Sequence, residues 1–220
     1  MKLLTLIPSL FLFTHCNSST PQMTTPNTTP ESIAITTTTP TNDTVQTAIF
    51  AAGCFWCVEA QLEQLQGVSK VESGYMGGSV KNPSYKEVCT GLTGHAEVVR
   101  VTYNPQVINY ATLLQAFFGA HDPTTLNRQG GDVGTQYRSS IFYTNEAQKA
   151  TAQQIITALN KEGAYAKPIV TLLEPLAAFY PAEDYHQNYF SLNGEQPYCQ
   201  FVIKPKMEKF QKVFKAQLKK

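Results

Sequence analysis

The chain has 220 residues and a formal net charge of +1 at pH 7, from 17 Lys and Arg against 16 Asp and Glu. This length allows one domain of ordinary size, or at most two small ones, with a core that needs no disulfide staples. A charge so close to zero argues against nucleic acid or anionic lipid as the main partner. The cysteines are too few and too unevenly spaced for a disulfide framework: Cys16, Cys54, Cys57, Cys89 and Cys199. A single CxxC pair is weak evidence for zinc, so no metal is expected.

Residues 1–16 have the pattern of a signal peptide. Lys2 precedes an apolar run over residues 3–13, which has signal-peptide length and is too short to span a bilayer stably. The run ends close to Cys16, as in bacterial lipoprotein signals, in which the cysteine is lipidated. His15 departs from the small residue usual before that cysteine, so an ordinary cleaved signal is the alternative. In both cases we expect the protein outside the cytoplasm, as a membrane-anchored lipoprotein or as a soluble secreted or periplasmic protein.

A tether follows, and then one domain over residues 47–220. Thr, Pro, Ser and Asn dominate residues 17–46, which carry too little apolar surface to offset the entropy of ordering. Four prolines favour an extended chain there: Pro21, Pro26, Pro30 and Pro40. We therefore expect a disordered tether between the signal and the domain.

The domain opens with a strand, a glycine and a helix. Residues 47–52 are a short apolar run of strand type, and residues 59–65 are strong helix formers with apolar positions at helical spacing. This places Cys54 in the first turn of the helix, where unpaired N–H groups and the helix dipole favour a thiolate. A thiolate is the form of cysteine that attacks and can be oxidised.

The residues beside Cys54 allow two interpretations. Phe55 and Trp56 can wall an apolar pocket around a reactive thiol. Alternatively, Cys54 and Cys57 are small buried side chains of the core, since free cysteine is often buried and inert.

Strands and helices alternate through the rest of the chain. Strands are predicted over residues 67–75, 95–103, 141–143 and 169–173, and helices over 109–118, 145–161, 182–190 and 204–220. Residues 85–91 are either one helical turn or a strand edge. Residues 121–140 form a long polar loop, and loops of this length tend to be functional. The mixture predicts a single α/β or α+β domain with a sheet covered by helices.

Three motifs carry a resemblance to a known family: GCFW at 53–56, GHAE at 94–97 and GGDVGTQYRS at 130–139. Together they resemble peptide methionine sulfoxide reductase A, with NPSY at 82–85 and DYHQ at 184–187 as further matching blocks. The resemblance covers residues 47–214. It implies an α+β two-layer sandwich with a ferredoxin-like core and a mixed sheet covered by helices. It also implies the reduction of methionine S-sulfoxide, free or in peptides and proteins, for repair of oxidative damage.

The resemblance also implies roles for individual residues. Cys54 would attack the sulfoxide sulfur and become a sulfenic acid. Glu97 would donate the proton to the departing oxygen, which requires burial to raise its pKa. Tyr85 and Tyr137 resemble the two tyrosines that hydrogen-bond the sulfoxide oxygen.

The resemblance also implies which residues bind the substrate and which cysteine resolves the sulfenic acid. Phe55 and Trp56 match the apolar pocket for the substrate methyl group, and Asp132 matches an acid that binds the substrate backbone. Cys199 resembles the C-terminal cysteine that resolves the sulfenic acid to a disulfide. Cys57, a departure from the commoner GCFWG pattern, competes with Cys199 for this role because its spacing permits a disulfide with Cys54.

The partners expected from this resemblance are oxidised proteins or peptides and an external thiol reductant. The reductant would be a thioredoxin-like protein, or dithiothreitol in vitro, with no cofactor. We expect a monomer, held at the membrane if Cys16 is lipidated. His186 lies in a matching block, and we interpret it as structural.

Two rival functions are carried forward. A thioredoxin-like thiol–disulfide oxidoreductase would use Cys54 and Cys57 and would make Glu97 irrelevant. A non-enzymatic lipoprotein would bind a ligand or cell-wall component through its aromatic residues and would tolerate Cys54→Ser.

Overall fold

The computed structural model describes residues 45–220. The predicted signal peptide and all but the last two residues of the predicted tether lie outside these residues. The domain described below begins with its first strand at Gln46.

Six strands form one mixed sheet in the order β7-β6-β1-β3-β2-β8. Their bounds are Gln46–Ala52 (β1), Val68–Met76 (β2), Ala96–Tyr103 (β3), Ser139–Tyr143 (β6), Leu172–Pro175 (β7) and Tyr180–Pro181 (β8). Neighbouring strands are antiparallel except β6 and β7, which run parallel. Both edges of β1 are paired, and residues 48–52 are buried. This explains why β1 is a continuous apolar run rather than an alternating one.

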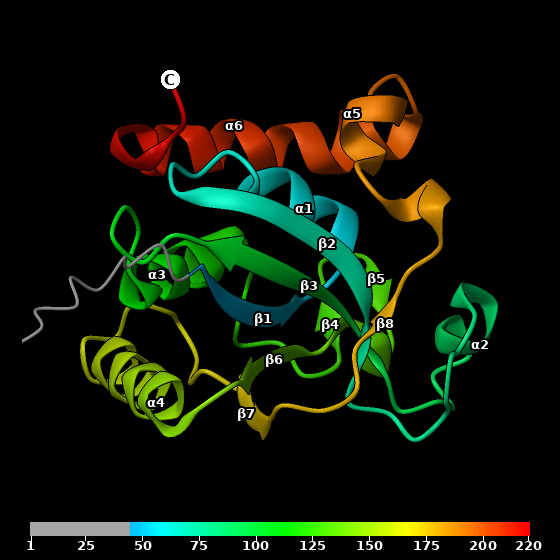
Figure 1. Ribbon diagram of the computed structural model, residues 1–220, viewed down its shortest axis with the longest axis horizontal. Helices are drawn as coiled ribbons and strands as arrows, with labels where there is room; N and C mark the ends of the chain where they lie inside the picture. Colours follow the sequence, from blue (N-terminus) through cyan, green and yellow to red (C-terminus); the bar gives the residue numbers. More distant parts are fainter. Residues whose placement is uncertain (1–44) are drawn as a thin grey trace, which may run out of the picture. The chain divides into compact units, whose positions relative to one another are not determined.

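The long helices cover one face of this sheet. Their bounds are Phe55–Leu62 (α1), Tyr110–Ala120 (α3), Glu146–Lys161 (α4) and Lys204–Val213 (α6). Helix α1 contacts β2, β3 and α3, and α6 lies along α1 at the top of Figure 1. The main apolar cluster fills the space between sheet and helices, where Phe50 stacks on Phe117 with ring centroids 5.0 Å apart.

A smaller apolar cluster occupies the other face of the sheet. It includes Ile49 and Phe142, and Phe179 from the segment joining β7 to β8 packs against it. This segment runs along the lower edge of the molecule in Figure 1. The arrangement is a mixed sheet flanked by helices in an α+β domain, and it confirms the predicted fold class.

Capping side chains define where three helices begin. Asn109 accepts a hydrogen bond from the Thr112 N–H at the start of α3, and Asn145 does the same with Gln148 at the start of α4. Ser84 forms a capping box at the start of α2 (Tyr85–Cys89), so residues 85–89 are the helical turn and not a strand edge. Each cap of this kind stabilises its helix by about 1 kcal/mol.

Two predicted elements end elsewhere in the structure. The strand predicted over residues 169–173 is β7 at Leu172–Pro175, because the Val170 N–H bonds to the carbonyl of Pro123 instead of joining the sheet. The helix predicted to residue 220 ends at Val213. Beyond it the chain turns back, and Leu218 forms a β-bridge with Leu65 just after α1.

The prediction of one continuous helix over residues 182–190 is also wrong. The structure has a 3₁₀ helix at Asp184–His186 and a separate short helix α5 at Tyr189–Asn193. Asn188 lies between them with a φ of 52°, a left-handed conformation that interrupts a helix. A π-helix at Cys199–Ile203 then leads directly into α6. This C-terminal segment therefore bends several times over the start of α1.

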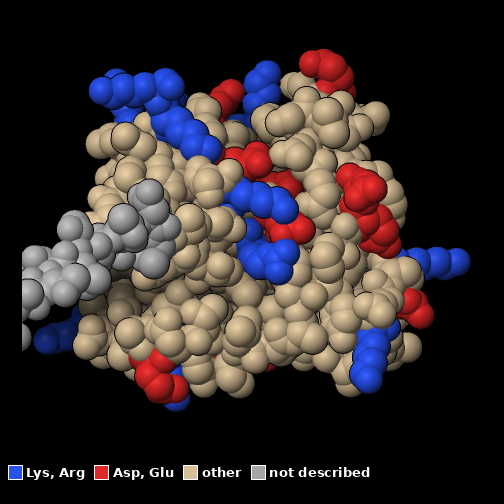
Figure 2. Space-filling view, viewed as in Figure 1, with Lys and Arg blue, Asp and Glu red and all other residues tan. Residues whose placement is uncertain are grey.

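Charged side chains of both signs are interspersed on the face shown in Figure 2. Lys70 and Arg100, for example, both contact the carboxylate of Glu72 on β2. Among residues 45–220, no helix has the length and apolar character that crossing a membrane would require.

Candidate active site

The turn between β1 and α1 presents Cys54 at the start of the helix. Gly53 has a φ of +83°, and a Cβ added there would lie 2.5 Å from the Cβ of Gln129. Only glycine fits this close approach at this φ. Cys54 is the N-cap residue of α1, and its carbonyl accepts a hydrogen bond from the Cys57 N–H at 3.1 Å.

A cavity of about 200 Å³ opens beside Cys54. Its lining consists of eight residues: Cys54, Phe55, Trp56, Tyr85, Glu97, Asp132, Tyr137 and Tyr198. The first seven are the residues that the sequence motifs singled out for substrate chemistry. They come from four distant parts of the chain, and the fold brings them together around one small space.

Glu97 is a buried carboxyl group facing the start of α1. It lies on β3, is 2 % exposed, and accepts a hydrogen bond from the Phe55 N–H at 3.0 Å. Burial raises the pKa of Glu97 to about 8, against the opposing effect of that N–H, and the nearby Asp132 adds to the rise. Glu97 is therefore mainly protonated at neutral pH and can donate a proton.

Two phenol groups lie at the same cavity. Tyr85 begins α2, and Tyr137 ends a 3₁₀ helix at Thr135–Tyr137. Burial is the largest cause that raises the pKa of each tyrosine, and the charge of Glu97 adds to it. Both phenols are therefore neutral hydrogen-bond donors at any physiological pH.

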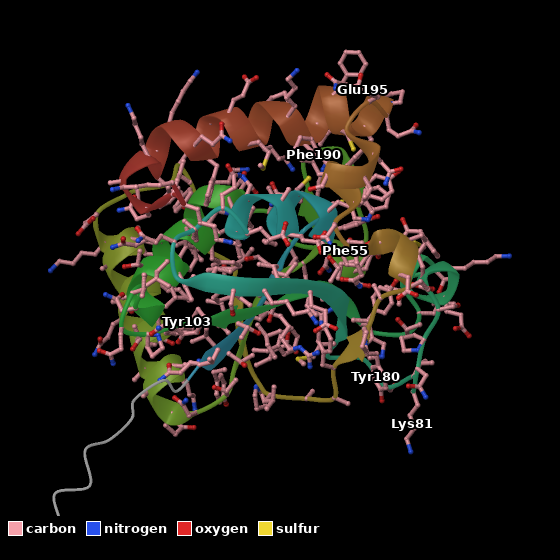
Figure 3. The ribbon with its side chains drawn as sticks, turned by 45° about the horizontal axis from the view of Figure 1, so that its top comes forward. Phe55, Lys81, Tyr103, Tyr180, Phe190 and Glu195 are labelled. Atoms are coloured by element: carbon pink, nitrogen blue, oxygen red, sulfur yellow. The ribbon has the colours of Figure 1, made fainter. Side chains whose placement is uncertain are left out.

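The aromatic wall is built around Trp56. Its indole stacks on Tyr189 with ring centroids 3.6 Å apart, and its Nε1–H donates to His186 Nδ1 at 3.1 Å. Figure 3 shows Phe55 at the start of α1 and Phe190, the neighbour of Tyr189, on the C-terminal segment above it. His186 is 1 % exposed and fixes Trp56 in place, which agrees with its interpretation as structural.

Tyr198 is a cavity residue that the sequence analysis missed. Its hydroxyl donates to Asp132 Oδ2 at 2.9 Å, and its ring meets Trp56 edge-on with centroids 5.8 Å apart. The only available signal was its position next to Cys199 in the C-terminal segment. Its place at the cavity depends on how that segment folds back, which no local pattern encodes.

The candidate resolving thiols lie behind the cavity. Cys54, Cys57 and Cys199 pack in one apolar cluster with Ile203 and Met207, and all three thiols are free and buried. Cys89, by contrast, is exposed on α2.

The ionisation of the thiols differs from the sequence expectation. Burial raises the pKa of Cys54, and the neighbouring sulfur of Cys57 adds to the rise. The first helical N–H, which was expected to favour a Cys54 thiolate, is bonded to Glu97 instead. The pKa of Cys57 is lowered to about 7, first by a hydrogen bond from Cys54 and further by the charge of Lys206, although burial opposes the shift. The prediction of a thiolate at Cys54 in the resting enzyme is therefore wrong.

Among residues 45–220, no group of three or more His, Cys, Asp or Glu is arranged to hold a metal ion. The cavity lining offers the sulfur of Cys54, the neutral carboxyl group of Glu97 and three phenols, those of Tyr85, Tyr137 and Tyr198. This combination, on an α+β scaffold, defines a thiol-dependent oxidoreductase.

Comparison with known proteins identifies the family. Residues 46–218 match the family model described as peptide methionine sulfoxide reductase, and the chain belongs to this family. It is 55 % identical over 172 residues to peptide methionine sulfoxide reductase MsrA of Deinococcus radiodurans, covering 78 % of this chain and 84 % of that one. It is 54 % identical over 170 residues to the MsrA of Chromobacterium violaceum, covering 77 % and 97 %.

Solved structures agree with this assignment. Reduced Mxr1 from Saccharomyces cerevisiae superimposes with a TM-score of 0.64 at 36 % identity, covering 70 % of this chain and 89 % of that one. Methionine sulfoxide reductase A of Corynebacterium diphtheriae gives a TM-score of 0.60 at 35 % identity, covering 68 % and 75 %. These comparisons confirm the family resemblance and the fold that it implied.

Proposed function

We propose that this chain reduces methionine S-sulfoxide, free or in peptides and proteins, to methionine, with Cys54 as the nucleophile. The observation that carries the proposal is the cavity itself, in which the Cys54 sulfur, the protonated Glu97 and two phenols surround one space. In this proposal the cavity of about 200 Å³ receives the side chain that carries the oxidised sulfur.

The first half of the reaction oxidises Cys54. Its sulfur attacks the sulfoxide, and Glu97 protonates the departing oxygen while the phenols of Tyr85 and Tyr137 donate hydrogen bonds to it. The sulfur–oxygen bond of the substrate breaks, methionine leaves, and the oxygen ends on Cys54. One thiol and one sulfoxide thus become one sulfenic acid and one thioether, so atoms and electrons balance.

Cys54 must lose its proton before it can attack, and the raised pKa of its thiol opposes this loss. The hydrogen bond between the Cys54 thiol and the Cys57 sulfur provides a path, because Cys57 can accept this proton. The nucleophile is then formed inside a closed site when substrate is present, and the resting thiol is protected from oxidation.

Two further groups orient the substrate in this proposal. Phe55 and Trp56 hold the methyl group of the sulfoxide, and Asp132 binds the substrate backbone. The Tyr198 hydroxyl already donates to Asp132 at 2.9 Å, which supports an acceptor role for this carboxylate.

The second half of the reaction regenerates Cys54. A second thiol, Cys199 or Cys57, condenses with the sulfenic acid, releases water and leaves an intramolecular disulfide. An external dithiol, a thioredoxin-like protein or dithiothreitol in an assay, then reduces that disulfide. We propose that the scheme uses no cofactor and that the protein acts as a monomer.

The S epimer of methionine sulfoxide is expected to be the only one reduced at a measurable rate. Cys54, the proton donors and the aromatic residues line one cavity, so the proposal predicts that the sulfoxide sulfur binds in one orientation. The test measures methionine released from the separated S and R epimers of a methionyl peptide, with purified protein and dithiothreitol. Equal rates for the two epimers would contradict the proposed geometry.

The thioredoxin-like alternative is not favoured. An enzyme of that type exposes an activated first cysteine of its CxxC pair. Here Cys54 is 7 % exposed with a raised pKa, and the ionised sulfur is that of Cys57.

We also propose that the protein acts outside the cytoplasm, anchored through a lipid on Cys16, with residues 17–46 as a tether to the domain. The apolar run that ends near Cys16 and the Thr- and Pro-rich stretch after it support this. The wild-type protein is expected to partition into the detergent phase when expressed in a bacterium, and Cys16→Ala into the aqueous phase. Equal partitioning of the two proteins would favour an ordinary cleaved signal.

A further inference from the structure

A contact between α1 and α6 joins Lys206 to Cys57, the residue proposed above to accept the Cys54 proton. The Lys206 Nζ lies 3.6 Å from the Cys57 Sγ. We propose that Lys206 is a positioning residue that holds Cys57 ready to attack the sulfenic acid of Cys54, so that Cys57 is the first resolving thiol and Cys199 acts later. This inference rests on the proposed function, because the sulfenic acid arises from sulfoxide reduction.

The ammonium group of Lys206 donates a hydrogen bond to the Cys57 sulfur. Among residues 45–220, no carboxylate lies within the 4.0 Å of an ion pair with Lys206. The Gln61 Nε2 donates to the Lys206 carbonyl at 3.4 Å, one turn beyond Cys57 on α1. This hydrogen bond joins α1 and α6 close to the contact between Lys206 and Cys57.

Several titratable groups lie around Cys57, on α1, α6, β3 and the C-terminal segment. The neighbouring Cys54 thiol and the positive charge of Lys206 both favour the Cys57 thiolate, and the Tyr198 hydroxyl nearby donates to Asp132. The carboxyl of Glu97 is mainly neutral below pH 8, so it opposes this charge little at neutral pH. Cys199 is a buried thiol whose own pKa is raised by burial. The ionised sulfur of the cluster is therefore that of Cys57.

The resolving step balances with groups already in place. The Cys57 thiolate attacks the Cys54 sulfur, the sulfur–sulfur bond forms, and the sulfur–oxygen bond of the sulfenic acid breaks. Cys57 first gives up the proton that it accepted from Cys54, and the leaving hydroxide takes up this proton and departs as water. Cys57 lies one helical turn from Cys54 and has the Lys206 ammonium group beside it, whereas Cys199, in the same apolar cluster, lies within a π-helix. The Cys199 thiol can then attack the Cys54 sulfur of this disulfide, which forms a Cys54–Cys199 disulfide and releases Cys57 as a thiol.

The experiment follows one turnover in full-length Cys199→Ser, in which Cys57 is the remaining candidate for resolution. Protein is mixed with excess methionine S-sulfoxide without reductant at pH values from 5.5 to 9. Samples are quenched with dimedone, and peptide mapping measures the Cys54 sulfenic acid and the Cys54–Cys57 disulfide over time. We expect the disulfide to form, with a rate that is half-maximal near pH 7, the pKa of Cys57.

Adding Lys206→Met should move this midpoint upward by about one pH unit, the usual minimum effect of a neighbouring opposite charge. At pH 6 the thiolate fraction falls about tenfold, but a more basic thiolate is about threefold more nucleophilic, so resolution slows about threefold. At pH 9 the variant should be as fast as its parent or faster. A merely structural role for Lys206 would instead slow the step at every pH.

Two matched variants complete the test. Lys206→Arg should keep the midpoint near pH 7 because it retains the charge. Lys209→Met, at an exposed lysine on the same helix, should leave the profile unchanged. In a chain that keeps Cys199, Cys57→Ser should lengthen the lifetime of the sulfenic acid, which tests the role of Cys57 even if Lys206→Met fails to fold.

Three outcomes would overturn the inference. They are a persistent sulfenic acid without the Cys54–Cys57 disulfide in Cys199→Ser, an unchanged midpoint in Lys206→Met, or a sulfenic acid that Cys57→Ser does not prolong. If neither methionine nor a sulfenic acid forms in the first place, it is the proposed function that fails, and the inference fails with it.

Discussion

Cys54→Ser is expected to abolish the formation of methionine from methionine S-sulfoxide, in a single turnover as well as in steady state. A serine hydroxyl is not ionised near neutral pH, and its oxygen cannot accept the sulfoxide oxygen as a sulfur can. The substitution removes one sulfur from a cavity whose other lining residues stay in place. The measurement is the yield of methionine per chain, by chromatography, after long incubation with dithiothreitol.

Cys89→Ser is the matched control for this prediction. Cys89 is also a free thiol, but it is exposed on α2 and does not line the cavity. We expect its variant to keep turnover within a few-fold of the wild type. Measurable single-turnover activity in Cys54→Ser, above that of a reaction without enzyme, would remove Cys54 from the mechanism.

Glu97→Gln is expected to slow the chemical step by about two orders of magnitude or more, the usual contribution of a general acid. The amide has nearly the same shape, and its oxygen can still accept the Phe55 N–H that Glu97 accepts at 3.0 Å. It cannot, however, donate an acidic proton to the departing oxygen. The loss is therefore expected in the rate of sulfenic acid formation rather than in folding.

The pH dependence of the same step gives a second readout. Burial raises the pKa of Glu97 to about 8, so the donating form dominates below that pH and is lost above it. The single-turnover rate of the wild type should carry a descending limb centred near pH 8, and Glu97→Gln should lack that limb. Rapid-quench measurements from pH 6 to pH 10 provide both quantities.

Glu63→Gln serves as the control for the acid. Burial also raises the pKa of Glu63, but this residue ends α1 outside the cavity. Its variant should retain both the rate and the descending limb. A Glu97→Gln variant with a near-normal single-turnover rate at neutral pH would show that the proton comes from another group.

The helix starts and most strands could be predicted from local patterns. Asn109 and Asn145 cap their helices as expected, because a capping side chain and its N–H partner lie within three residues. The end of the last helix could not be predicted in this way. Its amphipathic pattern continues beyond Val213, but the contact of Leu218 with Leu65 redirects the chain, and that contact joins distant segments.

The cavity residues were predicted from motifs and not from periodicity. Glu97 illustrates the difference, since its strand alone gives no sign that the carboxyl is buried against the start of α1. Tyr198 was missed because it reaches Asp132 only after the C-terminal segment folds across the site. The prediction of a Cys54 thiolate failed for the same reason, because the burial that raises the pKa of Cys54 depends on distant parts of the chain.

The most direct test of the central claim is one turnover of the wild-type chain with excess methionine S-sulfoxide and no reductant. Methionine released is measured by chromatography, and the oxidised cysteines are mapped by mass spectrometry. We expect about one methionine per chain, together with oxidation of Cys54 to a sulfenic acid or to a disulfide with Cys57 or Cys199. Methionine formed while Cys54 remains a reduced thiol would contradict the account.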